Sequence, residues 1–418
     1  MNVYDSDVLK SILTNHNYSI ADSPESADLI VINTCSVRQK AEIRALGHIK
    51  ELKQYKASNP NLKIAVVGCM AQRMQADLLK ELPFVDLVLG TERLFGLPVY
   101  LEKLEKSQIV DTSFSSCLPN GIIPSSHSQY CAFVAISRGC DNFCSYCIVP
   151  YVRGKEKHRP SHEILQEVRK LAQGGYKEVT LLGQNVNSYK DEAFDFADLL
   201  QRISDGTDIS WIRFMTSHPN DLSSKLIDKI SNSSKVCEHL HLPLQSGSDF
   251  ILQRMNRNYT ASGYLKLIEQ IRDKAGDICL TTDIMVGFPG ETLSDFQKTL
   301  GLVEKIRFDA AFTFHYSPRE RTKAAGFEDD VPQKEKVRRL GILIQLQKEI
   351  SLQRNQRFVG QGLEILVDGY SKKDKARLKG KTRTNKTVVL DRKEDFLGSF
   401  RKVKITSANP WTLFGELQ

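Results

Sequence analysis

Residues 138–147, with the sequence RGCDNFCSYC, place three cysteines within eight residues at the spacing C-x₃-C-x₂-C. They follow an apolar run, 131–136, which predicts a buried strand, so the cysteines lie on a loop that leaves a strand. Thiolates this close in sequence can face one soft metal centre together, as iron–sulfur clusters require. No fourth cysteine follows, and a cubane with three protein ligands leaves one iron open to an outside ligand. The spacing therefore predicts a reactive [4Fe-4S] cluster held by Cys140, Cys144 and Cys147.

A zinc knuckle, or three buried cysteines without a metal, are the alternatives for this loop. Zinc sites usually pair two C-x₂-C-like halves. The sequence contains no second half, which favours the iron–sulfur interpretation.

The cysteine loop is similar to that of the radical S-adenosylmethionine (SAM) superfamily. The residues after it, Ile148 to Gly154 (IVPYVRG) and Arg159-Pro160, resemble one branch of it, the methylthiotransferases. The resemblance covers nearly the whole chain. It implies that the open iron binds the amino and carboxylate groups of SAM, and that an electron from the cluster splits the sulfonium to give a 5′-deoxyadenosyl radical.

Composition is that of an ordinary soluble protein, with 41% hydrophobic and 26% charged residues in 418. This length allows two or three domains. No run approaches the roughly 18 apolar residues that span a bilayer, and no leader pattern opens the chain, so we expect a cytoplasmic protein without membrane contact. In a reducing compartment the nine cysteines are expected to be cluster ligands or small buried residues and not disulfides.

Positive charge is concentrated at the C-terminal end of the chain. The net charge is +8, and the last 62 residues, from Arg357, hold 14 Lys and Arg against 7 Asp and Glu. This imbalance predicts that the tail contacts a nucleic acid.

Residues 1–112 are predicted to form an open parallel α/β sheet. Short apolar runs at 28–33, 63–68 and 85–90 are each followed by an amphipathic stretch. Cys35 and Cys69 follow the first two runs, and the carboxyl ends of parallel strands share one edge. The sequences around these two cysteines look like the methylthiotransferase N-terminal motifs, which implies an auxiliary [4Fe-4S] cluster.

The start of the chain departs from the family pattern. The family has a first strand that ends in a cysteine before a Met-Asn pair, whereas this chain begins at Met1-Asn2 and enters a helix at 5–16. A sheet without that strand keeps an open edge, so we expect Met1 to be an internal methionine of a longer protein. If the protein does begin at Met1, the auxiliary cluster lacks its third ligand. Cys117 is the alternative ligand, but it lies in a Ser/Pro-rich linker, 113–128, where a solvated thiol is expected.

Within a core domain expected at 129–356, strands and helices alternate six times from Cys131 to Ser317. Strands are predicted at 132–137, 178–183, 211–215, 239–244, 278–286 and 310–316, and helices begin near Ser161, Phe194, Asp221, Ala261 and Thr292. Six units are too few for a closed eight-stranded barrel. We therefore expect a partial (β/α)₆ barrel with an open side, which is also the fold that the resemblance implies.

Polar loops follow four of these strands and predict a cofactor site at the strand ends. The candidate SAM-binding residues are Gln184, Asn185, Ser217, Gln245 and Ser246. Three histidines nearby are expected to pack or hydrogen-bond and not to bind metal: His218, His239 and His241. Arg153 and Arg257 are candidates for contact with a phosphate or carboxylate, with a solvated surface position as the alternative.

Residues 357–418 contain short β-prone runs parted by Gly, Asn and Pro, which predict a small β-barrel. We expect a basic loop at 371–386 (SKKDKARLKGKTRTNK) to grip RNA phosphates, with a disordered solvated loop as the alternative. The segment is similar to the TRAM domain that ends this family. The candidate RNA-binding residues are Lys372, Lys373, Lys381, Arg383 and Lys386.

The resemblance implies a tRNA methylthiotransferase that uses two SAM molecules and modifies C2 of isopentenyl-adenosine beside the anticodon. Its expected partners are the tRNA anticodon stem-loop, an electron donor such as flavodoxin or ferredoxin, and a sulfur donor. Relatives that modify threonylcarbamoyl-adenosine or a ribosomal-protein aspartate are alternatives, and the basic tail favours RNA. A non-catalytic iron–sulfur protein that binds RNA and senses redox state is an alternative of another class.

Overall fold

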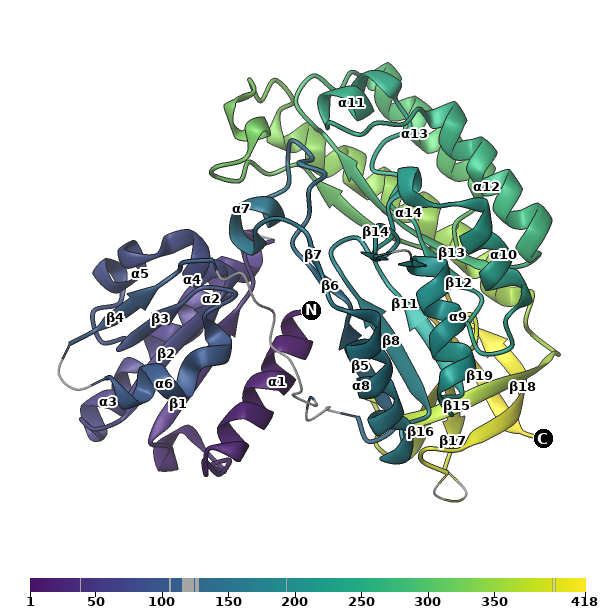
Figure 1. Cartoon of the computed structure of the whole chain (residues 1–418). Helices are drawn as coiled ribbons and strands as arrows, with labels where there is room; N and C mark the ends of the chain where they lie inside the picture. Colours follow the sequence, from purple (N-terminus) through teal and green to yellow (C-terminus); the bar gives the residue numbers. More distant parts are fainter. Residues whose placement is uncertain are drawn as a thin grey trace. The chain divides into compact units, whose positions relative to one another are not determined.

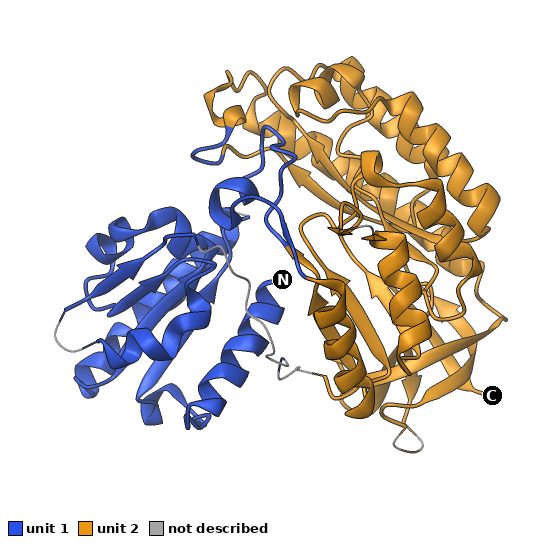
Figure 2. Ribbon diagram, in the orientation of Figure 1, with its two compact units in different colours: residues 1–127, 138–159, 319–322 blue, residues 128–137, 160–318, 323–418 orange. Residues whose placement is uncertain are grey.

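The computed structural model describes residues 1–418 except 38, 105–106, 115–123, 125–127, 193, 393 and 395. Cys117 therefore lies outside the described residues. The chain forms two compact units (Figure 2). Unit 1 comprises Met1–His127, Arg138–Arg159 and Arg319–Thr322, and unit 2 comprises Ser128–Ser137, Pro160–Pro318 and Lys323–Gln418.

Unit 1 is built on a parallel sheet whose strands follow the order of the chain (Figure 1). These strands are β1 (Leu29–Thr34), β2 (Lys63–Gly68), β3 (Leu87–Leu89) and β4 (Ile109–Asp111). The first three agree with the predicted apolar runs. The sequence does not reveal β4, because its three residues are too short a run to show a period.

Helices cover both faces of this sheet because its side chains alternate between the faces. Ile64, Val66 and Val88 pack against α2 (Gln39–Glu51), α4 (Cys69–Met74) and α5 (Ala76–Glu81). Ala65 and Leu87 point the other way and pack against α1 (Asn2–Asn15) and α6 (Leu97–Glu102). The remaining short elements of this unit are α3 (Lys53–Ser58), α7 (Val149–Arg153), η1 (Pro24–Ser26) and η2 (Leu94–Gly96).

Unit 2 contains the six predicted parallel strands. They form two hydrogen-bonded sheets, joined by a parallel bridge between Ile212 and Val236. Along the chain the strands are β5 (Cys131–Ala135), β8 (Glu178–Leu182), β11 (Trp211–Phe214), β12 (His239–His241), β13 (Cys279–Val286) and β14 (Ala310–His315). β12 ends earlier than predicted, since Pro243 has no N–H for the ladder. Unit 2 also holds a short pair, β9 (Lys190–Asp191) with β10 (Phe194–Asp195). In a second short pair, β6 (Ser137–Arg138) with β7 (Lys157–His158), residues 138 and 157–158 belong to unit 1.

Helices cover the outer face of these strands, and side chains cap the first turns of α9, α10, α12 and α13. Asp195 and Asp198 form a capping box, so α9 begins at Phe196 and not at 194, and Ser223 caps α10, which begins at Ser224 and not at 221. No helix of the described residues is long and apolar enough to cross a membrane. The helices are α8 (Ser161–Gln173), α9 (Phe196–Gly206), α10 (Ser224–Asn232), α11 (Asp249–Arg254), α12 (Ala261–Ala275), α13 (Leu293–Ile306), α14 (Gln333–Gln356), η3 (Pro219–Asp221) and η4 (Lys323–Gly326).

The C-terminal residues of unit 2 form a closed five-stranded barrel, drawn in yellow-green and yellow in Figure 1. Its strands are β15 (Gly362–Tyr370), β16 (Arg377–Thr382), β17 (Thr387–Asp391), β18 (Phe400–Ala408) and β19 (Thr412–Leu417). The prediction of one basic loop over 371–386 is wrong, because β16 lies inside it. Leu378, Gly380 and Thr382 alternate into the barrel, while the basic residues between them stay half-exposed.

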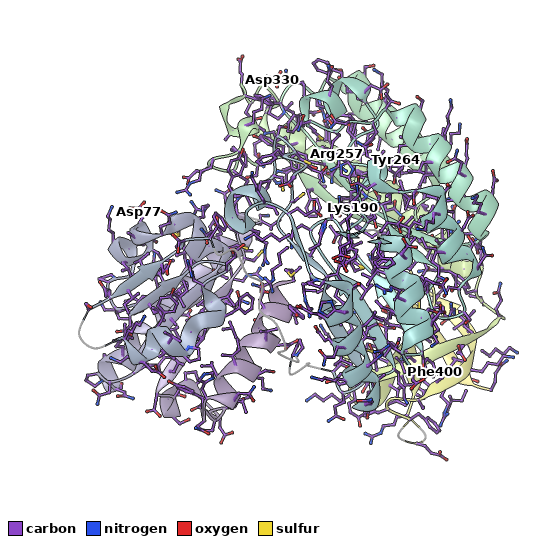
Figure 3. All side chains as sticks on the ribbon, in the orientation of Figure 1. Asp77, Lys190, Arg257, Tyr264, Asp330 and Phe400 are labelled. Atoms are coloured by element: carbon purple, nitrogen blue, oxygen red, sulfur yellow. The ribbon has the colours of Figure 1, made fainter. Side chains whose placement is uncertain are left out.

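Arg213 of β11 joins this barrel to the six-stranded one. Its Nη1 and Nη2 donate to the carbonyl oxygens of Arg383 (2.6 Å) and Thr382 (2.7 Å), and its Nε donates to Glu178 (2.8 Å). The ring of Phe400, labelled in Figure 3, lies 4.9 Å from that of Trp211. The turn between β16 and β17 is therefore fixed to the strands beneath it.

Two basic side chains of the same turn bind carboxylates of unit 2. Arg383 Nη2 lies 2.6 Å from Glu238 Oε1, and Lys386 Nζ lies 3.0 Å from Asp309 Oδ1. Lys386 and Asp309 are both buried. These contacts make the turn part of an internal interface.

Replacing Arg213 by alanine is expected to lower the free energy of unfolding by about 3–5 kcal/mol, because it leaves the buried Glu178 without its cation. Denaturant-induced unfolding measures this change. Arg338→Ala on α14 removes an exposed guanidinium that pairs with Glu335, and should change stability by less than about 1 kcal/mol. Equal effects of the two substitutions would show that the Arg213 contacts do not hold the fold.

Candidate active site

Cys35 and Cys69 follow the ends of β1 and β2. Thr34 pairs with Gly68 across these strands, so the two cysteines lie at the same sheet edge, as the sequence predicts. Gly68 allows the close approach, since its φ is +93° and a Cβ there would lie 2.6 Å from the Thr34 carbonyl oxygen. Burial raises the pKa of the Cys69 thiol, the Arg153 guanidinium opposes that change, and the nearby Cys35 thiol adds to it. The two sulfur atoms are therefore electrostatic neighbours.

A buried carboxylate beside these cysteines binds two arginines. Asp5 accepts from Arg138 Nη2 (2.6 Å) and Arg153 Nη2 (2.9 Å). Burial alone would raise the pKa of Asp5, but the two guanidinium groups hold it below its usual value. Arg138 also lies 4.7 Å over the ring of Phe95. The solvated position considered for Arg153 is thus wrong, and the anion it contacts is Asp5.

A second buried carboxylate supports the backbone after Cys35. Glu42 accepts from Arg73 Nε (2.9 Å) and Arg319 Nη2 (2.8 Å), and from the hydroxyl of Ser36. Arg319 also donates to the Ser36 carbonyl oxygen. Because Ser36 directly follows Cys35, this network fixes the direction in which the chain leaves that cysteine.

The loop of Cys140, Cys144 and Cys147 begins after a glycine that its geometry requires. Gly139 has φ +80°, in the left-handed region that favours glycine. Asn142 Nδ2 donates to Cys140 Sγ (3.4 Å), and the Cys147 amide donates to the Cys144 carbonyl (2.9 Å). No three His, Cys, Asp or Glu side chains converge to hold a metal ion within the described residues. Three half-buried thiols on one loop nevertheless supply the soft donors that an iron–sulfur cluster uses.

In unit 2, side chains at the ends of β5, β8 and β11 carry buried oxygen atoms that have no hydrogen-bond partner among the described residues. Among the described residues, no hydrogen bond reaches Ser137 Oγ, Gln184 Oε1, Asn185 Oδ1 or Ser217 Oγ. A Cβ at Gly183 would lie 2.3 Å from Ser137 Oγ, so this glycine leaves room that a side chain would fill. Unpartnered buried oxygens cost about 1–3 kcal/mol each, and a polar ligand would relieve that cost. Sequence reasoning missed Ser137, although it follows β5 as Gln184 follows β8.

The two candidates after β12 differ from each other. Ser246 is fully buried, accepts from the Ser248 amide (3.2 Å), and lies 3.4 Å from the hydroxyl of Thr299 on α13. These contacts make Ser246 a structural residue. Gln245 has φ +66°, and its backbone N–H donates to the Asp283 carbonyl (2.8 Å), so the chain turns sharply there. Gln245 remains a candidate for cofactor binding.

The histidines of unit 2 take part in hydrogen bonds. His239 Nε2 and His241 Nδ1 lie 3.2 Å and 3.0 Å from the hydroxyl of Thr281. Burial and the positive charge of Arg257 lower the pKa of His218 to about 3, so this side chain is neutral. Arg257, labelled in Figure 3, is buried, which overturns the solvated position considered for it.

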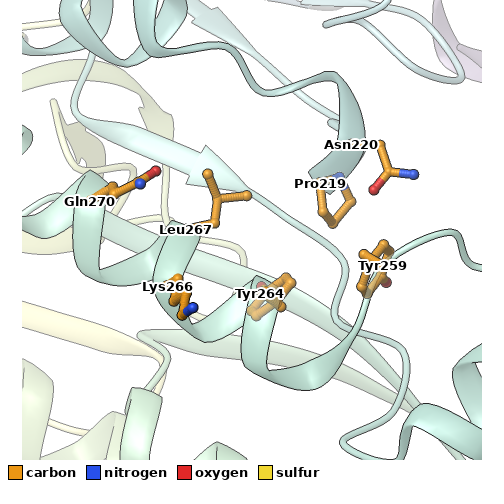
Figure 4. Close-up of a pocket in the computed structure, with 8 residues that line it drawn as sticks. Pro219, Asn220, Tyr259, Tyr264, Lys266, Leu267 and Gln270 are labelled. Carbon is orange, nitrogen blue, oxygen red and sulfur yellow. The ribbon is translucent and has the colours of Figure 1, made fainter.

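Two open pockets lie beside the strand-end loops of unit 2, and they share Asn220. Their volumes are about 300 Å³ and about 460 Å³. The smaller one, shown in Figure 4, is lined by Pro219, Asn220, Tyr259, Gly263, Tyr264, Lys266, Leu267 and Gln270. Neither pocket is lined by the unpartnered oxygens described above, so we assign no cofactor to them.

The five basic residues predicted to bind RNA divide into two groups. Lys372 and Lys373 are exposed, and Lys381 is half-buried. Arg383 and Lys386 are bound to carboxylates in the interface of the C-terminal barrel. These two contacts hold the barrel in place, and RNA contact by Arg383 and Lys386 stays a prediction.

Two solved structures of radical SAM enzymes have a similar fold. The radical SAM methyltransferase TsrM from Kitasatospora setae is 14% identical, with a TM-score of 0.54 and coverage of 74% of this chain and 69% of its own. The cobalamin-dependent radical enzyme OxsB is also 14% identical, with a TM-score of 0.54 and coverage of 81% and 54%. These similarities concern the fold alone.

Three family matches divide the chain. Residues 134–303 match the radical SAM superfamily, residues 1–90 match the uncharacterized protein family UPF0004, and residues 356–418 match the TRAM domain. A tRNA-2-methylthio-N(6)-dimethylallyladenosine synthase from Thermoanaerobacter pseudethanolicus is 48% identical over all of this chain and 90% of its own length. One from Clostridium botulinum strain Langeland is 44% identical over all of this chain and 94% of its own length. The chain therefore belongs to the radical SAM superfamily, in the family of the tRNA-2-methylthio-N(6)-dimethylallyladenosine synthases.

Proposed function

We propose that this protein is a tRNA methylthiotransferase that inserts a methylthio group at C2 of isopentenyl-modified adenosine next to the anticodon. The observation that carries the proposal is the 48% identity along the whole chain to a synthase named for that product. The TRAM match favours RNA over a ribosomal protein as the substrate. The C–H bond at C2 of adenine is neither acidic nor hydridic, so no side-chain base activates it at neutral pH.

The functional segments are the N-terminal domain at 1–112, a linker at 113–128, the radical SAM core at 129–356 and the RNA-binding domain at 357–418. The three family matches support this division.

Cys140, Cys144 and Cys147 hold the radical [4Fe-4S] cluster, and Cys35 and Cys69 provide two ligands of the auxiliary one. When bound, these clusters and SAM supply the radical and the sulfur chemistry that no side chain provides. The protein contributes the sulfur ligands and their positions. Asn142 Nδ2 donates to Cys140 Sγ and orients that ligand.

SAM is held at the strand ends of unit 2. Its amino, carboxylate and ribose groups suit buried side-chain oxygens without partners, and Ser137, Gln184, Asn185 and Ser217 each have such an oxygen among the described residues. Gln245 completes the set at the end of β12. Ser137 and Ser217 can donate their hydroxyl protons to the cofactor, whereas the side-chain oxygens of Gln184 and Asn185 accept.

The RNA surface lies on the C-terminal barrel around Lys372, Lys373 and Lys381. The cluster requires electrons from a donor such as flavodoxin or ferredoxin, and the transferred sulfur requires a sulfur donor. A tRNA substrate places the protein in the cytoplasm.

The reconstituted chain, given SAM and dithionite, should add a methylthio group to isopentenyl-adenosine in tRNA, measured by mass spectrometry of nucleosides. Cys144→Ala should lose about four irons per chain and stop formation of 5′-deoxyadenosine. Cys279→Ala, which removes a buried thiol of β13, should keep its iron and still form 5′-deoxyadenosine. Sulfur on threonylcarbamoyl-adenosine would change the assigned nucleoside. Iron without any 5′-deoxyadenosine would favour the non-catalytic RNA-binding class.

Ser217→Ala should weaken SAM binding about five- to tenfold, since one hydrogen bond contributes about 1 kcal/mol. Stability of the free protein should rise by about 1–3 kcal/mol, because the substitution removes a buried hydroxyl that has no partner among the described residues. Calorimetry measures the affinity. Ser246→Ala is the matched control and should lower stability by about 1 kcal/mol while leaving SAM affinity intact. Loss of stability without loss of affinity in Ser217→Ala would contradict the assignment.

Replacing Lys372 and Lys373 together by glutamate should weaken tRNA binding and reduce the slope of log affinity against log salt by about one to two, because two phosphate contacts are lost. Filter binding at several salt concentrations measures the slope. Lys334→Glu, which changes an exposed lysine on α14, should leave the slope unchanged. If the unaltered protein, the double variant and Lys334→Glu all give the same slope, Lys372 and Lys373 do not contact RNA phosphates.

A further inference from the structure

Helix α7 links the radical-cluster loop to Cys69 within unit 1. It begins at Val149, two residues after Cys147, and ends at Arg153. Ile148 and Val152 pack directly against Cys69. The Val152 carbonyl also accepts a hydrogen bond from the hydroxyl of Thr91 (2.7 Å). The position of this helix is thus fixed from both sides.

Arg153, at the end of this helix, uses only part of its hydrogen-bonding capacity on Asp5. Its Nη2 donates to Asp5, whereas Nη1 is buried and has no hydrogen-bond partner in the described part of the chain. The side chain is 7% exposed, and its neighbour Val152 packs against Cys69. A buried donor without a partner is costly unless a bound group accepts from it.

The charged side chains beside Cys69, namely Asp5, Arg138 and Arg153, carry a net positive charge. Asp5 carries one negative charge, and Arg138 and Arg153 carry one positive charge each. A surplus buried cation is strongly destabilising unless an anion accompanies it. Cysteine sulfur bound to iron is such an anion, since a thiol must lose its proton to become a ligand. The surplus charge therefore favours metal-bound sulfur at Cys69.

We infer that Arg153 is a positioning residue of the auxiliary site, which donates a hydrogen bond to the Cys69 sulfur, offsets the negative charge of the cluster bound there, and ties that site to the radical-cluster loop through α7. The inference rests on the proposed assignment of Cys35 and Cys69. Hydrogen bonds to cluster sulfur and nearby positive charge both stabilise the reduced, more negative state. Arg153 accordingly raises the reduction potential of the auxiliary cluster.

The test uses the full chain with Cys140, Cys144 and Cys147 all replaced by alanine, so that the only iron present is auxiliary. Iron content is counted after reconstitution, and the midpoint potential is measured by a redox titration followed by electron paramagnetic resonance. Arg153→Gln should shift the midpoint to a lower potential. Arg153→Lys keeps the positive charge but loses the paired N–H donors of the guanidinium, so it should shift the midpoint by less in the same direction.

Arg93→Gln is the matched control, because it removes a half-exposed guanidinium of unit 1 that contacts Asp111 and Ser113. It should leave the midpoint unchanged. If Arg153→Gln does not fold, Arg153→Lys is used as the test, and an unshifted midpoint in that variant contradicts the inference. Unshifted midpoints with normal iron content overturn the role of Arg153 but leave the proposed function intact. A parent protein that holds no iron overturns the assignment of Cys35 and Cys69 together with the inference.

Discussion

Parallel strand pairing is the constraint on which both units depend. In a parallel sheet all strands end at one edge, so residues that leave successive strands come together. This pairing brings Cys35 close to Cys69 in unit 1. It also places Ser137, Gln184 and Ser217 after neighbouring strands in unit 2. One hydrogen-bonding pattern therefore generates a sulfur-rich edge in one unit and an oxygen-rich edge in the other.

Two buried arginines show how differently the same side chain is used. Arg213 directs its Nε at Glu178 and its two terminal nitrogens at the carbonyl oxygens of Thr382 and Arg383. Such an arginine, with oxygen acceptors for all three nitrogens, holds structure. Arg153 is also buried, but its Nη1 has no hydrogen-bond partner among the described residues. Burial alone would not separate the two roles, whereas the distribution of their hydrogen bonds does.

The sequence predicts most of the strands because their signal is local. Apolar runs mark the six strands of the larger unit, and cysteine spacing marks the loop of 140–147. β16 escapes prediction because Arg377, Lys379 and Lys381 occupy its outward positions and make the segment look like a loop. The carboxylate partners of Arg383 and Lys386 are not predicted for another reason, since they lie about 145 and 77 residues away in the chain. A pattern read within a short window cannot find such partners.

The turn between β16 and β17 limits how freely this protein can be divided. A TRAM barrel is easily imagined as an interchangeable module, but here its turn supplies cations to Glu238 and Asp309, and its Phe400 covers Trp211. A fragment that ended before residue 357 would leave those groups facing water. Exchange of this barrel between enzymes would therefore require Glu238, Asp309 and Trp211 to be transferred with it. The barrel and the core that it contacts must therefore change together during evolution.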